Sequence, residues 1–211
     1  CINLENIVIP NSVSAIGGDA FAGTKWYDNE EDGMVYAGNV LYKYKGSMPA
    51  NTAITISDGT LGIAGKAFAD CSGITSVTIP SSMTTIGDRA FYNCSNIKDI
   101  ISYVSAEDLF ILGSEAFAGV SLNTCTLYVP YNAKETYATT EGWKDFVNIE
   151  GYKVVAILDD YETIDLGNIV LSEQGKGEFS LNLDENSTNI KSIALVYEKS
   201  IPLIGFKGSK I

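Results

Sequence analysis

One short motif recurs four times in the first 120 residues, and this repeat constrains the fold more than any other feature of the sequence. The motif begins with Ile or Leu and ends with Ala-Phe; its phenylalanines are Phe21, Phe68, Phe91 and Phe117. They are 47, 23 and 26 residues apart, which fits a unit of about 23 residues if about 24 residues are inserted after Phe21. Because one such unit cannot bury its apolar face alone, the sequence predicts a stack of units that share a core.

Each unit also has a strand-like half before the motif. The segment Ile74–Pro80 has apolar residues at its first, fourth and sixth positions and ends in proline, and Leu4–Pro10 is its near copy. Val77 and Ile79 are two residues apart, so they point to the same face of a strand. Proline lacks the N–H that a ladder needs, so we expect Pro80 to end the strand. The Ala-Phe segments then fall on short helical or irregular turns, where the phenylalanine rings can stack from unit to unit.

The segment Ile79–Cys94 reads Ile-Pro-x-Ser-Met-x-x-Ile-Gly-x-x-Ala-Phe-x-x-Cys, which resembles the BspA-type leucine-rich repeat of bacterial surface proteins. The resemblance covers about residues 1–150, although residues 97–111 lack the Ile-Pro pair and have Tyr103 in the place of the proline. It implies a β-rich leucine-rich-repeat solenoid, with parallel strands and short helical turns, in an extracellular or cell-surface protein used in adhesion or partner binding. Residues 121–150 resemble the C-terminal cap of such arrays, with a short helix that we expect Asn132 to N-cap.

After residue 150 the repeat stops and a different pattern begins. Short runs rich in Val, Ile and Leu alternate with stretches of turn-prone residues, which is typical of an all-β domain. With no helical interval between the runs, residues 151–211 are predicted to form a small antiparallel β-sandwich-like domain, immunoglobulin-like or prealbumin-like. The expected strands are Lys153–Leu158, Thr163–Ser172, Glu178–Leu183 and Lys191–Glu198.

The four cysteines follow the repeat and not a disulfide pattern. Cys71 and Cys94 each follow a repeat phenylalanine by three residues, so they occupy equivalent places in adjacent units. Cys1 precedes Leu4 by the offset that separates Cys71 from Ile74, which makes it the last residue of a preceding unit; the alternative is the lipidated first residue of a lipoprotein. Cys125 alternates with apolar strand residues. We therefore expect four free thiols, since a buried ladder cysteine behaves as a small hydrophobe.

Composition excludes several classes of function. The chain has no histidine, which removes Ser-His-Asp and Cys-His catalytic sites and histidine-ligated metals, and we expect neither catalysis nor a cofactor or metal. With 14 basic and 26 acidic residues, a net charge of −12 argues against nucleic acid as a partner. No apolar run is long enough to span a membrane, so attachment requires a signal or an anchor outside this sequence.

The most informative stretch for binding is the predicted insertion at about residues 25–50. Val35–Tyr44 is predicted to form a β-hairpin around Gly38 and Asn39. Exposed Trp and Tyr side chains are enriched at binding hot spots and can also contact the face of a sugar. The alternative is that the hairpin packs on the convex side of the repeats and buries these rings. The aromatic residues concerned are Trp26, Tyr27, Tyr36, Tyr42 and Tyr44.

Two polar features remain. The spacing of Asp28, Glu30 and Asp32 before Gly33 is similar to the first half of a calcium loop, but position twelve is Asn39, which favours a solvated acidic loop. The second feature is a predicted concave strand face with short polar side chains, which either contacts a partner or is simply solvated. This face comprises Glu5, Asn6, Thr75, Ser76, Thr78, Lys98 and Asp99.

These observations predict a non-catalytic, secreted or surface-anchored binding protein. Its partner is an unknown host or bacterial surface protein. The alternatives are a glycan-binding accessory module and a passive spacer that projects other domains. Because an interface needs an anchor that can be desolvated, we expect the hairpin tyrosines Tyr42 and Tyr44 to contribute more to binding than the concave strands do.

Overall fold

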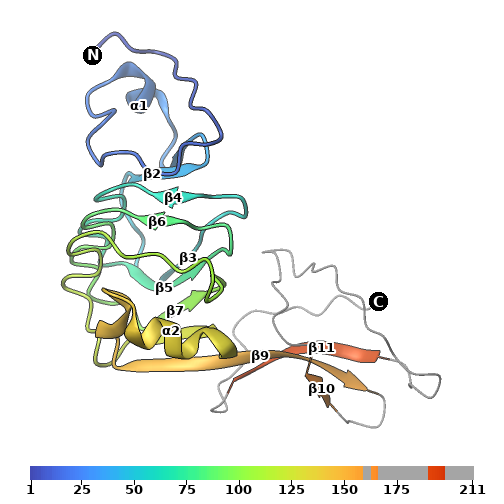
Figure 1. The fold of residues 1–211 in the computed structure, drawn as a ribbon. Coiled ribbons are helices and arrows are strands. Elements are labelled where there is room, and N and C mark those ends of the chain that lie inside the picture. The colour runs from blue at the N-terminus through green and yellow to red at the C-terminus, as the bar shows by residue number, and fades with distance from the viewer. Residues whose placement is uncertain (159–162, 166–189, 198–211) are drawn as a thin grey trace.

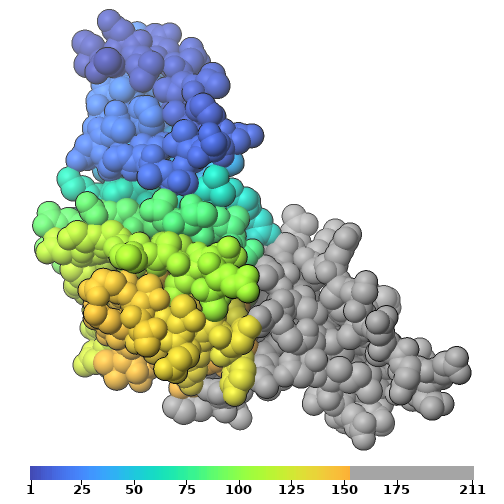
Figure 2. Space-filling model, in the orientation of Figure 1, coloured from blue at the N-terminus to red at the C-terminus, as the bar shows by residue number. Residues whose placement is uncertain are grey.

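The structure is a computed structural model that describes residues 1–158, 163–165 and 190–197. Rungs of chain are stacked from the N-terminal segment at one end to the residues near 150 at the other (Figures 1 and 2). Two sheets run along the stack. The short sheet has the order β1 (Gly33–Ala37), β2 (Val40–Lys45), β4 (Gly62–Ile63) and β6 (Thr85–Ile86).

The long sheet lies on the other side of the stack. Its order is β10 (Thr163–Asp165), β9 (Asn148–Leu158), β8 (Thr126–Pro130), β7 (Asp99–Ser102), β5 (Ile74–Ile79) and β3 (Thr52–Thr55), and β11 (Ile190–Tyr197) also pairs with β9. The neighbours from β3 to β9 are parallel. The helical segments are short: α1 (Lys25–Asn29), the 3-10 turn Tyr131–Ala133, α2 (Lys134–Thr139) and the 3-10 turn Trp143–Asp145.

The alternation predicted for the strands is present. On β5 the side chains of Ile74, Val77 and Ile79 are buried, and the strand ends immediately before Pro80 as expected. Equivalent residues of successive strands lie side by side, so that Val77 pairs with Ile100 of β7. The core of the stack is therefore a set of apolar rows that run perpendicular to the strands.

The phenylalanine stack is confirmed for three of the four repeat motifs. The ring of Phe91 lies between those of Phe68 and Phe117, with centroid distances of 5.1 Å on both sides and interplanar angles of 8° and 1°. At one end of this stack Tyr44 lies 6.3 Å from Phe68. Phe21 is not part of it, because it packs instead on Trp26 and Tyr42.

The aromatic stretch that looked like an insertion is itself a rung of the stack. β2 pairs in parallel with β4, and the N–H of Tyr44 donates to the carbonyl of Ala67 at 2.8 Å, as that of Phe68 donates to Ala90 at 2.8 Å. Tyr44 thus stands where the other rungs have phenylalanine, 23 residues after Phe21. Two residues later in each rung φ is positive: Gly23 (67°), Gly46 (81°), Asp70 (64°), Asn93 (58°) and Gly119 (87°).

We call residues 24–46 the aromatic rung. It differs from its neighbours because α1 and β1 take the place of a strand in the long sheet. The predicted hairpin is confirmed, since β1 and β2 pair antiparallel around Gly38, whose φ is 61°. It does not lie on the convex side of the array as an appendage, however, because β2 continues the short sheet.

The irregular rung after β7 is completed by the C-terminal cap. Tyr137 of α2 is fully buried, and its hydroxyl lies 2.7 Å from the Ser102 hydroxyl and donates to the Val104 carbonyl at 3.1 Å. The indole N–H of Trp143 donates to the Phe110 carbonyl at 2.8 Å. The expectation that Asn132 caps the helix is wrong: it lies within the 3-10 turn, and no side chain caps α2.

β9 connects the repeats to the C-terminal segment. Residues Asn148 to Tyr152 pair in parallel with β8, whereas Tyr152 to Leu158 pair antiparallel with β11. The strand therefore continues through the position after residue 150 where the repeat pattern stops. The expected strand Lys153–Leu158 is part of β9, and β10 and β11 overlap the expected strands Thr163–Ser172 and Lys191–Glu198. The expected strand Glu178–Leu183 and the sandwich arrangement lie outside the described residues.

All four cysteines are free, as expected. Cys94 and Cys125 are buried, Cys71 is half-buried and Cys1 is exposed. Burial raises the pKa of the Cys94 and Cys125 thiols to about 12 and also raises the pKa of Cys71. The two buried thiols are thus protonated at neutral pH as well as shielded from reagents.

Deleting the Tyr137 hydroxyl tests the connection between cap and irregular rung. Tyr137→Phe leaves the buried Ser102 hydroxyl and Val104 carbonyl without this partner, so the free energy of unfolding should fall by about 1–3 kcal/mol. Urea unfolding followed by circular dichroism measures the change. The same substitution at half-exposed Tyr92 should change stability by less than about 0.5 kcal/mol. Equal effects of the two substitutions would show that the hydrogen bonds of the Tyr137 hydroxyl add nothing to stability.

Thiol titration tests the placement of the cysteines. With a chromogenic disulfide reagent at about pH 8, Cys1 should react first and Cys71 more slowly, whereas Cys94 and Cys125 should react only on unfolding because they are buried and protonated. Four thiols should be counted in denaturant without reductant. A count of two or fewer would contradict the four free thiols.

Candidate functional site

Two of the predicted aromatic anchors are buried. Tyr42 is fully buried and Trp26 is 9% exposed; their ring centroids are 5.9 Å apart, and the Phe21 ring contacts both. The Tyr42 hydroxyl accepts a hydrogen bond from the Phe21 N–H at 3.0 Å, and burial raises its pKa. The interpretation of these two rings as exposed anchors is therefore wrong, and the alternative that they are buried is confirmed.

The reason is that β2 is covered on both faces. Leu41 points into the main core of the stack, whereas Val40 and Tyr42 point into a second apolar cluster. That second cluster is closed by the N-terminal segment, which contributes Ile7, Ile9, Val13, Ile16 and Phe21. A hairpin on the surface would leave one of these faces exposed, but a strand within a stack does not.

Two further aromatic residues, Tyr27 beside this cluster and Tyr44 beside the main core, are half-buried. The Tyr27 ring lies 5.5 Å from the ring of Tyr42. The Lys45 ammonium lies over the Tyr27 ring, 5.5 Å from its centroid. Burial is the main cause that raises the pKa of Tyr27. Tyr44 packs partly against the main core, next to Phe68. These four aromatic side chains thus contribute mainly to packing.

The acidic loop is organised around a lysine. Lys45 donates from its ammonium to the backbone carbonyls of Tyr27, Asp28 and Glu30, which closes the end of α1. Within the described part of the chain, no three His, Cys, Asp or Glu side chains come close enough to hold a metal ion. The spacing of Asp28, Glu30 and Asp32 therefore does not converge on one point.

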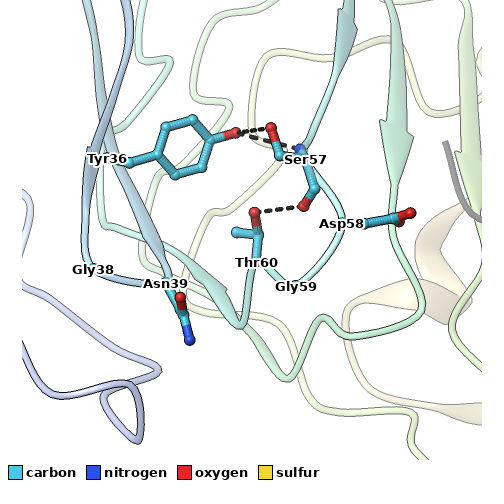
Figure 3. Close-up of a pocket in the computed structure, with 7 residues that line it drawn as sticks. All are labelled: Tyr36, Gly38, Asn39, Ser57, Asp58, Gly59 and Thr60. Atoms are coloured by element: carbon cyan, nitrogen blue, oxygen red, sulfur yellow. Dashed lines mark hydrogen bonds between the residues drawn. The ribbon is translucent and has the colours of Figure 1, made fainter. Parts of the chain in front are cut away.

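Tyr36 is the member of the aromatic set that lines a pocket. From β1 its ring extends to the loop after β3, where the hydroxyl accepts from the Ser57 N–H at 3.3 Å and lies 3.4 Å from the Ser57 hydroxyl (Figure 3). The open pocket has a volume of about 220 Å³ and is lined by Tyr36, Gly38, Asn39, Ser57, Asp58, Gly59 and Thr60. In Figure 3 the Asp58 side chain points away from the pocket.

The predicted polar strand face is formed by β5 and its neighbours. Thr75, Ser76 and Thr78 are partly exposed on β5, and the Thr75 hydroxyl donates to the Thr52 carbonyl at 3.3 Å. Two rows of side chains cross the strands on the outer side of the sheet, Ala53, Ser76, Asp99 and Thr126 in one, and Thr55, Thr78, Ile101 and Tyr128 in the other. Of these, Tyr128 is itself buried. Partial burial raises the pKa of Asp99.

The structure thus separates the predicted site residues into four places. Trp26, Tyr27 and Tyr42 share a buried cluster, Tyr44 ends the phenylalanine stack, and Tyr36 lines the pocket. Thr75, Ser76 and Thr78 lie on β5. No sequence motif connects Asn39, Ser57 and Thr60, so no signal in the sequence indicates that they line a pocket. The pocket exists only where the aromatic rung departs from the regular geometry.

Truncating Tyr42 distinguishes packing from binding. Tyr42→Ala should lower the free energy of unfolding by about 3–5 kcal/mol, the range for a buried aromatic side chain. Met34→Ala, at an exposed position of the same hairpin, should change it by less than about 0.5 kcal/mol. Thermal and urea unfolding measure both. A Tyr42→Ala variant of unchanged stability would restore the interpretation of Tyr42 as an exposed anchor.

Comparison with known proteins agrees with the stacked rungs. The family described as the BspA type leucine rich repeat region matches residues 1–29 and 42–141, in six copies. The match resumes at Tyr42 within β2, so it omits β1 and the residues Val40 and Leu41 through which β2 pairs with β4. A search of curated proteins found no match to the chain. Across the described residues, no helix has the length and apolar character needed to cross a bilayer. The family match covers more than half of the chain, which therefore belongs to the BspA-type leucine-rich repeat family.

Proposed function

We propose that this chain is a non-catalytic binding protein of the bacterial cell surface or its surroundings, which uses a repeat solenoid as a scaffold for adhesion. Proteins with BspA-type repeats are typically secreted or displayed on the surface, and such repeats serve as scaffolds for protein–protein interaction. The partner we propose is a protein on a host or bacterial surface, bound by the outer face of the long sheet around β5.

The observation that carries this proposal is the pair of outward hydroxyl side chains that β5 holds on a rigid ladder. Ser76 and Thr78 are held in register with β3 and β7 by parallel pairing, so their positions are fixed before any partner binds. Their short side chains have little rotamer freedom to lose, and each hydroxyl can both donate and accept a hydrogen bond. A fixed array of hydroxyls is suited to the polar part of a protein interface.

The proposal is tested by placing bulk and charge on that face. Fluorescently labelled chain is added to cultured epithelial cells, and bound chain is measured by flow cytometry before and after trypsin treatment of the cells. Binding should be saturable and trypsin-sensitive. The double variant Ser76→Arg with Thr78→Arg should bind at least about tenfold more weakly, because two large cations must be accommodated in the interface.

Thr84→Arg provides the matched control. Thr84 is exposed next to β6 on the other sheet, so the same type of substitution there should leave cell binding unchanged. Circular dichroism must show that all variants are folded. Equal binding by the double variant and the control would contradict a binding role for β5, and absence of any saturable binding would favour the passive spacer.

A further inference from the structure

The pocket at Tyr36 exists because the long sheet is interrupted. Among the described strands, β3 is the last of the long sheet at this end, since the aromatic rung before it forms α1 and β1 instead of another strand. The loop after β3 therefore faces the hairpin turn and not the equivalent loop of a neighbouring long-sheet strand. The loops after β3 and β5, by contrast, are joined by a direct hydrogen bond: the Ser82 hydroxyl donates to the Thr60 carbonyl at 2.8 Å.

The groups around the pocket are uncharged or turned away. Tyr36 contributes its ring and hydroxyl, and Ser57 and Thr60 contribute hydroxyls. Thr60 is almost fully buried and already donates to the Ser57 carbonyl at 2.6 Å, so the exposed Ser57 offers the more accessible hydroxyl. No lysine or arginine lines the pocket. Gly38 and Gly59, both with positive φ, keep the turn and the loop free of side chains.

These features restrict the ligand. An anion such as a phosphate or carboxylate needs a cationic partner, which this lining does not offer, and the Asp58 carboxylate on the same loop opposes it. The volume of about 220 Å³ is smaller than the roughly 300–1,000 Å³ of sites for drug-sized molecules. A group of several hydroxyls on a small ring fits both constraints, since its O–H groups can donate to the exposed Ser57 hydroxyl while its C–H face lies against Tyr36.

We propose that the pocket between the hairpin turn and the loop after β3 binds one neutral sugar ring of a glycan. This adds a ligand class to the proposed adhesion role but uses residues separate from the β5 face. A scaffold with both features contacts a glycosylated partner at two places, and two weak contacts on one rigid body reinforce each other.

The test uses the full chain labelled with ¹⁵N. The methyl glycosides of glucose, galactose, mannose and N-acetylglucosamine are titrated separately, with glucuronic acid and N-acetylneuraminic acid as charged counterparts. At least one neutral glycoside should shift the amide signals of Gly38, Asn39, Gly59 and Thr60 in a saturable manner. The acidic sugars should bind more weakly or not at all, because the lining has no cation.

Three variants locate the site. Tyr36→Ala should weaken binding by more than about tenfold through loss of both the ring and its hydroxyl, and Tyr36→Phe by about two- to tenfold through the hydroxyl alone. Tyr36→Phe also covers the possibility that the alanine variant fails to fold. Tyr92→Phe, at a half-exposed tyrosine on a different rung, should leave the affinity unchanged.

Three results would overturn the proposal: no saturable shift with any neutral glycoside, equal affinity in Tyr36→Phe and the unmodified chain, or preference for an acidic sugar. None of these results affects the β5 face, because the cell-binding assay with the arginine variants measures that surface by itself. Conversely, loss of cell binding in those variants leaves the glycoside titration unchanged.

Discussion

The rest of the structure depends on the backbone ladder between successive rungs. Each turn of the chain donates to the carbonyl of the equivalent turn in the next rung, as Phe68 does to Ala90 and Phe91 does to Ala116, both at 2.8 Å. This spacing brings equivalent side chains into contact, which is why the rings stack 5.1 Å apart and the apolar rows are continuous. It also keeps the outward side chains of the long sheet in fixed rows. Core and candidate binding face are thus two consequences of one hydrogen-bond register.

The aromatic rung shows what happens when only half of the ladder is kept. Its short-sheet strand β2 stays in register with β4, so Tyr44 takes the place of a stacked phenylalanine. Its long-sheet half is replaced by α1 and β1, which leaves β3 as the last described strand at that end. One departure therefore explains two observations that look unrelated in the sequence: the burial of the aromatic cluster and the pocket at Tyr36.

Much of the fold follows from the sequence because each repeat unit imposes the same physical constraint as its neighbours. The alternation in Ile74–Ile79, the strand end at Pro80 and the phenylalanine stack were all predicted, since each depends on residues close together in one unit and on their copies in the next. The free cysteines follow from the same reasoning, because a residue at an equivalent position in each rung takes an equivalent environment. The hairpin around Gly38 was predicted from local turn chemistry alone.

The sequence by itself determined the repeat, its family, the strand faces and the absence of histidine chemistry, because these are properties of composition and of short-range period. Only the tertiary structure decided which aromatic residues are accessible. A run such as Val40–Tyr44 reads the same whether one face or both faces of the strand are covered, and the N-terminal segment that covers Tyr42 lies more than twenty residues earlier in the chain. The pocket likewise requires two segments, the hairpin and the loop after β3, to meet at a place where the long sheet is interrupted. The exposure of a side chain depends on segments that are distant in the sequence and pack against it, and a local sequence pattern carries no information about such segments.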